Sequence, residues 1–175
     1  AKGLDPVADV EIPIATSLAE KTTGLVSSLY PQIADKKIVN RILELEKEHG
    51  SLDPAVALTI AEEIAKEKFC KFIDHKEAIE AGARLGIAYL TLGVVSSPIE
   101  GFTGLDFGKT AKGENYFVVN YSGPIRSAGG TEAAFSVVIL DYLREVFGYV
   151  KYDPTENEVK RGIHESYLYH ERVTN

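Results

Sequence analysis

The segment with the clearest chemical potential is the glycine-rich stretch Tyr121-Ser-Gly-Pro-Ile-Arg-Ser-Ala-Gly-Gly-Thr131, which stands between an expected strand and an expected helix. Glycines allow backbone N–H groups to converge on a ligand, and a helix N-terminus adds partial positive charge. Arg126 can bind a phosphate through two parallel hydrogen bonds. This combination predicts an anion site for a phosphate group. The residues expected to contact the phosphate are Arg126, Ser127, Gly129, Gly130 and Thr131.

Positive charge also concentrates in this part of the chain. Between residues 107 and 131 the cations Lys109, Lys112 and Arg126 stand against the single acid Glu114, so three minus one gives +2. The whole chain carries −7, and we therefore include Lys109 and Lys112 in the predicted site. A glycine-rich turn from strand to helix also allows a helix to pack closely on a sheet, so packing without any ligand is the alternative interpretation.

Two common phosphate-binding motifs are excluded by the spacing. Counting from Gly123, Ala128 stands where a Walker A loop needs glycine, and the residue before Thr131, where the motif has its lysine before Ser or Thr, is Gly130. The spacing of Gly123, Gly129 and Gly130 also differs from the Gly-x-Gly-x-x-Gly turn of dinucleotide-binding folds. The sequence therefore argues against nucleotide hydrolysis and against a Rossmann domain.

Other reactive side chains lack the partners that catalysis or metal binding requires. His164 and His170 are six residues apart and lie on different faces of a helix. Cys70 has no recognisable histidine partner, and its neighbours Phe69 and Phe72 indicate packing. We predict no catalytic residue and no metal site in this chain. Tyrosines gather near the end and could stack on bases or pack helices: Tyr142, Tyr149, Tyr152, Tyr167 and Tyr169.

The elements that must position the glycine-rich stretch follow from capping and periodicity. Apolar spacing and Asp caps predict helices at about 36–49, 53–65 and 74–90, with Gly82 and Gly86 permitting a close helix contact. A hairpin is expected at about 103–122, with residues 117–119 covered on both faces, and then a helix at about 132–147 that is buried nearly all round. Asp153 and Pro154 predict the start of a fifth helix. The first 35 residues favour irregular or briefly helical structure. We predict an α+β fold, mainly helical, with a small antiparallel sheet.

Composition limits the broad class of protein. The chain has 175 residues, a normal globular composition and a net charge of −7, so any nucleic-acid contact must be local. One cysteine excludes an internal disulfide, and no apolar run is long enough to span a bilayer. These features predict a cytoplasmic protein without a membrane partner. The chain has no methionine and its last residues still read as helix, so we expect a fragment of a larger protein.

The glycine-rich signature, followed by Ala134, Ser136 and Val137, resembles a sequence near the start of the large subunit of archaeal family D DNA polymerase. The resemblance extends through the stretches 9–13 and 88–101, through Asp141 and Tyr142, and as far as Tyr167 and His170, so it covers most of the chain. It implies that residues 1–175 form one N-terminal accessory domain, with a helical part at about 1–97 and the hairpin, loop and remaining helices at about 98–175.

The resemblance also implies a function for the parent protein. That protein is expected to be a replicative, heterodimeric DNA-directed DNA polymerase, a nucleotidyltransferase whose small subunit carries a 3′–5′ exonuclease. Its divalent metal (Mg) and zinc are expected in downstream domains that this chain lacks, so no cofactor is expected in the fragment. For the fragment we predict contact with the backbone of primer-template DNA. The alternative is an assembly module that packs on the downstream catalytic region or the small subunit, or that self-associates.

Overall fold

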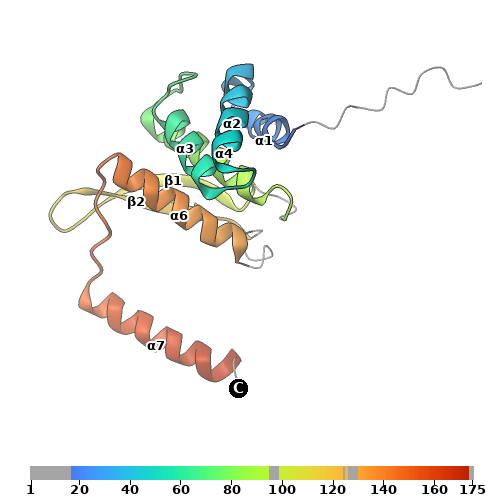
Figure 1. Cartoon of the computed structure of the whole chain (residues 1–175). Helices are drawn as coiled ribbons and strands as arrows, with labels where there is room; N and C mark the ends of the chain where they lie inside the picture. Colours follow the sequence, from blue (N-terminus) through green and yellow to red (C-terminus); the bar gives the residue numbers. More distant parts are fainter. Residues whose placement is uncertain (1–16, 95–98, 124, 126–129, 174–175) are drawn as a thin grey trace, which may run out of the picture.

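The computed structural model describes residues 17–94, 99–123, 125 and 130–173 (Figure 1). Within these residues there are six α-helices, one short 3-10 helix and a two-stranded antiparallel sheet, which confirms a mainly helical α+β fold. In chain order the elements are α1 (Leu18–Ser27), η1 (Pro31–Ile33), α2 (Lys36–His49), α3 (Pro54–Ala65), α4 (His75–Thr91), β1 (Phe102–Lys109), β2 (Asn115–Tyr121), α6 (Thr131–Val146) and α7 (Glu156–Val173).

Local capping sets the boundaries of the three central helices, as the sequence predicted. The Asp35 side chain accepts a hydrogen bond from Lys37 N, and α2 ends at His49 with Gly50 as its C-cap. Asp53 caps α3 with Pro54 in its first turn, and Asp74 accepts from the backbone N of Glu77 at the start of α4. Helix α1 lies where only irregular or brief helix was expected. It begins with a capping box in which Ser17 and Glu20 exchange hydrogen bonds.

The core is centred on the contact between α3 and α4, and two glycines of α4 make that contact possible. A Cβ built at Gly82 would overlap the carbonyl oxygen of Ala61, and one at Gly86 would lie 3.0 Å from the carbonyl oxygen of Ala57. The predicted close helix contact is therefore confirmed. Buried side chains of α1, α2, β1 and α6 complete the same core.

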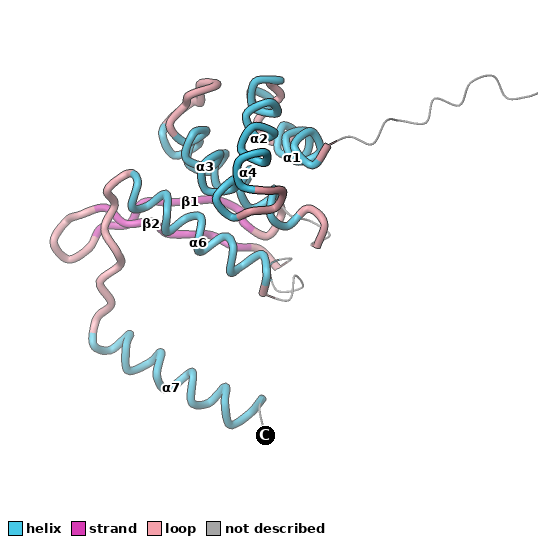
Figure 2. Tube along the Cα trace, viewed as in Figure 1, coloured by secondary structure: helices cyan, strands magenta, loops and turns pink. Residues whose placement is uncertain are grey.

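The predicted hairpin is confirmed and forms the whole sheet in the described residues (Figure 2). Phe107 pairs with Phe117, Lys109 pairs with Asn115, and the register shifts between Phe102 and Gly104. Phe102 and Leu105 of β1 are buried in the core. Residues 117–119 of β2 are only half-buried, so the expected cover on both faces is wrong. Two strands alone leave part of each face without a neighbouring element.

Helix α6 was expected to be buried nearly all round, and this prediction is also wrong. Ile139, Leu140 and Leu143 are buried, because this side of α6 packs against α4 and α3. Val137 and Val138 are 59% and 55% exposed. The apolar sequence of this helix therefore supplies an open apolar surface as well as a core face.

Helix α7 lies apart from the other helices in Figure 1, and none of its described residues is buried. It starts at Glu156, and the predicted cap at Asp153 is wrong by two residues. The Thr155 backbone N and hydroxyl both donate to Glu158 Oε2, and Glu158 N lies 3.3 Å from Thr155 Oγ1. This reciprocal pair gives hydrogen-bond partners to backbone N–H groups at the start of the helix. Pro154 stays outside the helix.

Candidate nucleic-acid interface

The predicted phosphate-binding residues fall partly outside the described residues. Arg126, Ser127 and Gly129 are not described, whereas Gly130 and Thr131 are. Gly130 stands at the N-terminus of α6 with φ +85°, a left-handed conformation that favours glycine over residues with a side chain. Gly130 is exposed, and so is Gly123 at the other end of the stretch. The two described flanks therefore present backbone to solvent.

The first flank of the stretch is fixed where β2 ends. Ser122 N donates to Gly101 O at 2.9 Å, and Ser122 Oγ donates to Glu100 O at 2.5 Å. The Tyr121 hydroxyl and Ser136 Oγ are hydrogen-bonded at 2.8 Å, which connects the end of β2 to α6. The chain therefore enters the glycine-rich stretch from a defined position.

The second flank lies against Gly101 through Glu132, in the first turn of α6. Its side chain is fully buried against the backbone of Gly101 and Phe102. Neither carboxylate oxygen forms a hydrogen bond of ordinary geometry within the described part of the chain. Burial raises the pKa of Glu132 above its usual value, although the nearby amides of Gly101 and Phe102 oppose the rise. Both flanks of the stretch therefore meet at Gly101.

Arg84 of α4 holds the backbone segment 99–103 that receives both flanks. Arg84 is 6% exposed, and its guanidinium donates to the carbonyls of Ile99 at 2.8 Å, of Thr103 at 2.8 Å, and of Phe102. Its carbon Cζ lies 4.8 Å from the centre of the Phe102 ring. Several directed donors on one rigid plane fix this segment in a way that a single ammonium group would not.

Two further polar side chains complete this buried network. Arg84 Nε donates to the Tyr30 hydroxyl at 3.2 Å, and burial raises the pKa of that hydroxyl. Glu80 Oε1 accepts a hydrogen bond from the backbone N of Leu105 at 2.7 Å. Sequence reasoning did not find Arg84. The signal was an arginine between Gly82 and Gly86, in a helix that is otherwise apolar from Ala83 to Leu90.

The two lysines assigned to the site lie at the opposite end of the hairpin. Lys109 ends β1, its Nζ donates to Gly113 O at 3.3 Å, and Lys112 is exposed in the turn. Strand β2 separates this turn from Gly123, and its seven residues span roughly 20 Å. Lys109 and Lys112 therefore do not share one phosphate position with Gly130 and Thr131.

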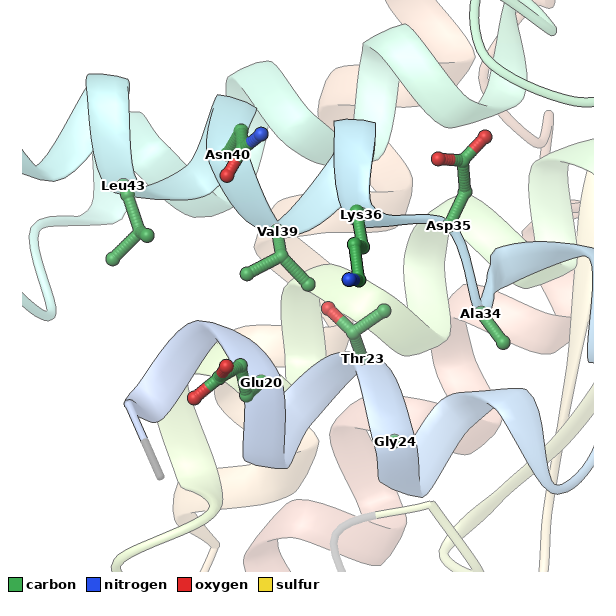
Figure 3. Close-up of a pocket in the computed structure, with 9 residues that line it drawn as sticks. All are labelled: Glu20, Thr23, Gly24, Ala34, Asp35, Lys36, Val39, Asn40 and Leu43. Atoms are coloured by element: carbon green, nitrogen blue, oxygen red, sulfur yellow. The ribbon is translucent and has the colours of Figure 1, made fainter. Parts of the chain in front are cut away.

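A cavity of about 450 Å³ lies between α1 and α2, and Figure 3 shows the side chains around it. Its two carboxylates already serve as helix caps, since Glu20 bonds to Ser17 and Asp35 to Lys37 N. Val39 and Leu43 add apolar wall, Thr23 Oγ1 already donates to Ala19 O at 2.7 Å, and Lys36 and Asn40 supply the two remaining polar side chains. The cavity therefore offers few free polar groups that could orient a ligand.

The other candidate side chains serve packing. Burial raises the pKa of the half-buried Cys70 thiol, which disfavours the reactive thiolate. The His75 ring contacts the rings of Phe147 and Tyr149, at centroid distances of 4.7 and 6.4 Å. In the described ranges, no three His, Cys, Asp or Glu side chains are placed to hold a metal ion. No helix in the same ranges is long and apolar enough to cross a membrane.

Comparison with known proteins decides the family. The family described as "DNA polymerase II large subunit DP2, N-terminal" matches residues 1–175. The chain belongs to this family.

Its relatives are DNA polymerase II large subunits. The chain is 42% identical to the subunit of Nanoarchaeum equitans over 99% of the chain, and 40% identical to that of Methanococcoides burtonii over 97%. It is 39% identical to the subunit of Pyrococcus abyssi over 99%. These alignments cover 14%, 14% and 12% of the respective relatives, so the chain spans about a seventh of their length or less. The resemblance found in the sequence is therefore confirmed for the N-terminal region of this large subunit.

Proposed function

We propose that this chain is the N-terminal accessory region of a replicative DNA-directed DNA polymerase. Family membership over the whole chain supports the proposal. The parent enzyme would extend a primer with deoxynucleotides in the cytoplasm, together with a small subunit that carries the 3′–5′ exonuclease. Divalent metal and zinc would belong to downstream domains. The described residues do not fit a metal ion, so we assign no catalytic step to them.

Within that enzyme, we propose that the glycine-rich stretch contacts the sugar–phosphate backbone of primer-template DNA. The observation that carries this role is that one flank is hydrogen-bonded to Gly101 and the other packs against it, while Gly123 and Gly130 are exposed. A rigid support beneath two exposed glycines suits backbone N–H contact with phosphate. Backbone contact also suits a replicative enzyme, because it carries no sequence information directly.

Charge restricts how such a contact would be arranged. The chain carries −7 overall, so binding requires local cations. Arg126 would serve the glycine-rich stretch, whereas Lys109 and Lys112 lie roughly 20 Å from Gly123 along the hairpin. A duplex that follows the hairpin places phosphates on one strand about every 3.4 Å along its axis, so this separation is about six base pairs. The lysines would then contact a different part of the same duplex.

A second role is favoured by a separate observation. Helix α7 and the outer side of α6 expose large apolar side chains, such as Ile163 at 66% and Val137 at 59%. Adjacent exposed apolar residues on a defined surface are typical of interaction sites. The N-terminal region would then also serve assembly, either on the rest of the polymerase or between copies.

Titration against a fluorescent primer-template duplex tests the DNA contact. The 175-residue chain is compared with Arg126→Ala at several salt concentrations, and Arg161→Ala serves as a control because Arg161 lies in α7 and pairs with Glu165 at 2.6 Å. We expect Arg126→Ala to weaken binding to all sequences and to reduce the salt slope by about one, with no change for Arg161→Ala. If the chain does not bind the duplex at low salt, or if Arg126→Ala leaves the affinity and the salt slope unchanged, the phosphate contact is refuted. The assembly role would then remain.

A further inference from the structure

Strand β2 is the open edge of the two-stranded sheet. In an antiparallel pair, the backbone N–H and C=O groups of successive residues turn alternately toward the partner strand and away from it. Thr110 N donates to Glu114 O at 2.9 Å, which fixes this alternation at the hairpin turn. Counted along the register from this pair, the backbone groups of Phe117 and Val119 point outward. Within the described ranges these outward groups form no hydrogen bond.

Helix α4 covers the other edge of the sheet, which belongs to β1. Leu105 N donates to Glu80 Oε1 at 2.7 Å, and Thr103 O accepts from Arg84 at 2.8 Å. In Figure 2, β1 lies on the side of the helices α3 and α4, and β2 lies on the side away from them. Strand β2 also has no charged residue and no proline, which are the residues that help exposed edge strands to resist pairing. Its edge is therefore a template for a further strand.

The first position on this edge is already used by the linker between α6 and α7. Val150 N donates to Asn115 O at 3.1 Å. Asn115 O points outward by the same alternation, so a neighbouring strand would make this bond in the same way. No second backbone hydrogen bond joins the linker to β2 within the described residues. The edge from Phe117 to Tyr121 therefore stays open.

An apolar groove lies beside the open part of the edge, between β2 and α6. Its volume is about 230 Å³, and Val137, 59% exposed, lines it from α6. The charged lining residues, Asp141 and Arg144, already pair with each other at 2.7 Å. Alternate side chains of an added strand would enter this groove, so it favours apolar residues at every second position. On the β2 side the groove is lined by the alternating residues Phe117, Val119 and Tyr121.

We propose that an extended segment of the same large subunit, from outside residues 1–175, adds to β2 as a third strand. Its backbone would pair with Phe117 and Val119, and its apolar side chains, at every second position, would fill the groove. The proposal rests on the proposed function, because it takes the chain as the N-terminal region of a larger subunit. It names the contact through which this region would be assembled on the rest of that subunit.

Two observations favour this occupant over the small subunit and over a second copy. The aligned regions cover 14% of the Nanoarchaeum equitans subunit and 12% of the Pyrococcus abyssi subunit, so most of a full-length subunit lies outside the match. A segment of the same polypeptide is present at a high effective concentration. In addition, the linker of the same chain already pairs with this edge at Asn115. A permanent intramolecular strand would also protect an uncharged edge from aggregation through strand pairing.

Photo-cross-linking identifies the occupant. The full-length large subunit, in complex with its small subunit, carries p-benzoylphenylalanine in place of Val137 or, as the matched control, in place of Val138. Val138 is 55% exposed and adjoins Val137 but does not line the groove. We expect position 137 to cross-link within its own chain, without a change of mass on a denaturing gel, to a segment of alternating apolar residues that position 138 does not reach. A cross-link from position 137 to the small subunit or to a second copy, or no cross-link, overturns the proposal.

Hydrogen exchange tests the strand pairing itself. In the same complex, the amides of Phe117 and Val119 are expected to exchange slowly, because the added strand accepts their N–H groups. Val137→Asp places a charge in the groove and is expected to speed their exchange by about tenfold or more, whereas Val138→Asp leaves it unchanged. Fast exchange of both amides in the wild-type complex, or an equal response to the two variants, overturns the proposal.

Amides on the inner side of β2 show whether the hairpin stays folded. The N–H groups of Tyr116 and Val118 point toward β1 by the same alternation, so their exchange should remain slow in every variant. The cross-link decides the proposal even if Val137→Asp unfolds the hairpin. DNA titration of Val137→Asp is expected to keep the effect of Arg126→Ala on affinity and salt slope. Loss of the strand pairing and loss of the phosphate contact are therefore separate results.

Discussion

Substitution of Gly82 by alanine is expected to destabilise the chain even though alanine is the better helix former. The new Cβ would overlap Ala61 O and would lie 3.1 Å from Ala65 N, both of which are backbone atoms of the facing helix. Backbone cannot rotate out of the way as a side chain can, so α3 and α4 must separate by roughly 1 Å, which weakens many dispersion contacts at once.

The magnitude follows from two opposing effects. Alanine gains about 1 kcal/mol over glycine in a helix interior, whereas overpacking of a close contact costs about 3 kcal/mol at the upper end of the usual range. The net loss of unfolding free energy is therefore about 2 kcal/mol. Gly24 in α1 is the matched control, because a Cβ built there meets no atom within 4 Å. Gly24→Ala is expected to add about 1 kcal/mol instead.

Urea unfolding monitored by circular dichroism measures both values. The two Gly→Ala variants are expected to differ by about 3 kcal/mol, which corresponds to about 6–12 °C in Tm for a chain of this size. Gly86→Ala is expected to fall between them, since its built Cβ lies 3.0 Å from Ala57 O. Equal unfolding free energies for Gly82→Ala and Gly24→Ala would refute the claim that the α3–α4 contact depends on a missing side chain.

The buried polar groups beneath the glycine-rich stretch give two further predictions. Arg84→Met is expected to lower the unfolding free energy by about 3 kcal/mol or more, because it leaves the carbonyls of segment 99–103 unpaired, whereas Arg161→Met in α7 should have little effect in the same urea measurement. Burial raises the pKa of Glu132, so its contribution to stability is complete below the ordinary value of 4.5 and is lost as pH rises through the raised value. In unfolding measurements, the stability of Glu132→Gln relative to wild type should therefore increase from acidic to neutral pH. A difference that does not change with pH would contradict the raised pKa of Glu132.

Local signals allowed much of the helical part to be predicted from the sequence. An Asp cap acts within three residues, so Asp35, Asp53 and Asp74 mark helix starts without any knowledge of the fold. Helix α1 was harder, because Thr22, Thr23 and Gly24 have low helix propensity. Its threonines are buried and bond back to carbonyls one turn earlier, so tertiary packing supports this helix.

Features that depend on contacts between distant residues could not be predicted in the same way. The apolar composition of α6 shows that the helix has apolar surface, but it does not say how many neighbours are present to cover that surface. Val137 and Val138 remain exposed because the sheet has only two strands among the described residues. The lysines were grouped with the glycine-rich stretch by sequence distance, whereas the strand β2 places Lys109 and Lys112 at the other end of the hairpin.

The core and the glycine-rich stretch are connected through α4 and segment 99–103. Gly82 and Gly86 set the distance between α3 and α4, and Arg84 stands between them on α4. Arg84 in turn holds segment 99–103, and Gly101 of that segment receives Ser122 from one flank and Glu132 from the other. A change in the core contact therefore displaces the support of the stretch without touching it. If the stretch binds phosphate, Gly82→Ala that remains folded should weaken DNA binding while keeping the salt slope, because the charge of Arg126 is still present. Loss of that slope would instead mean that the cation itself no longer reaches the phosphate.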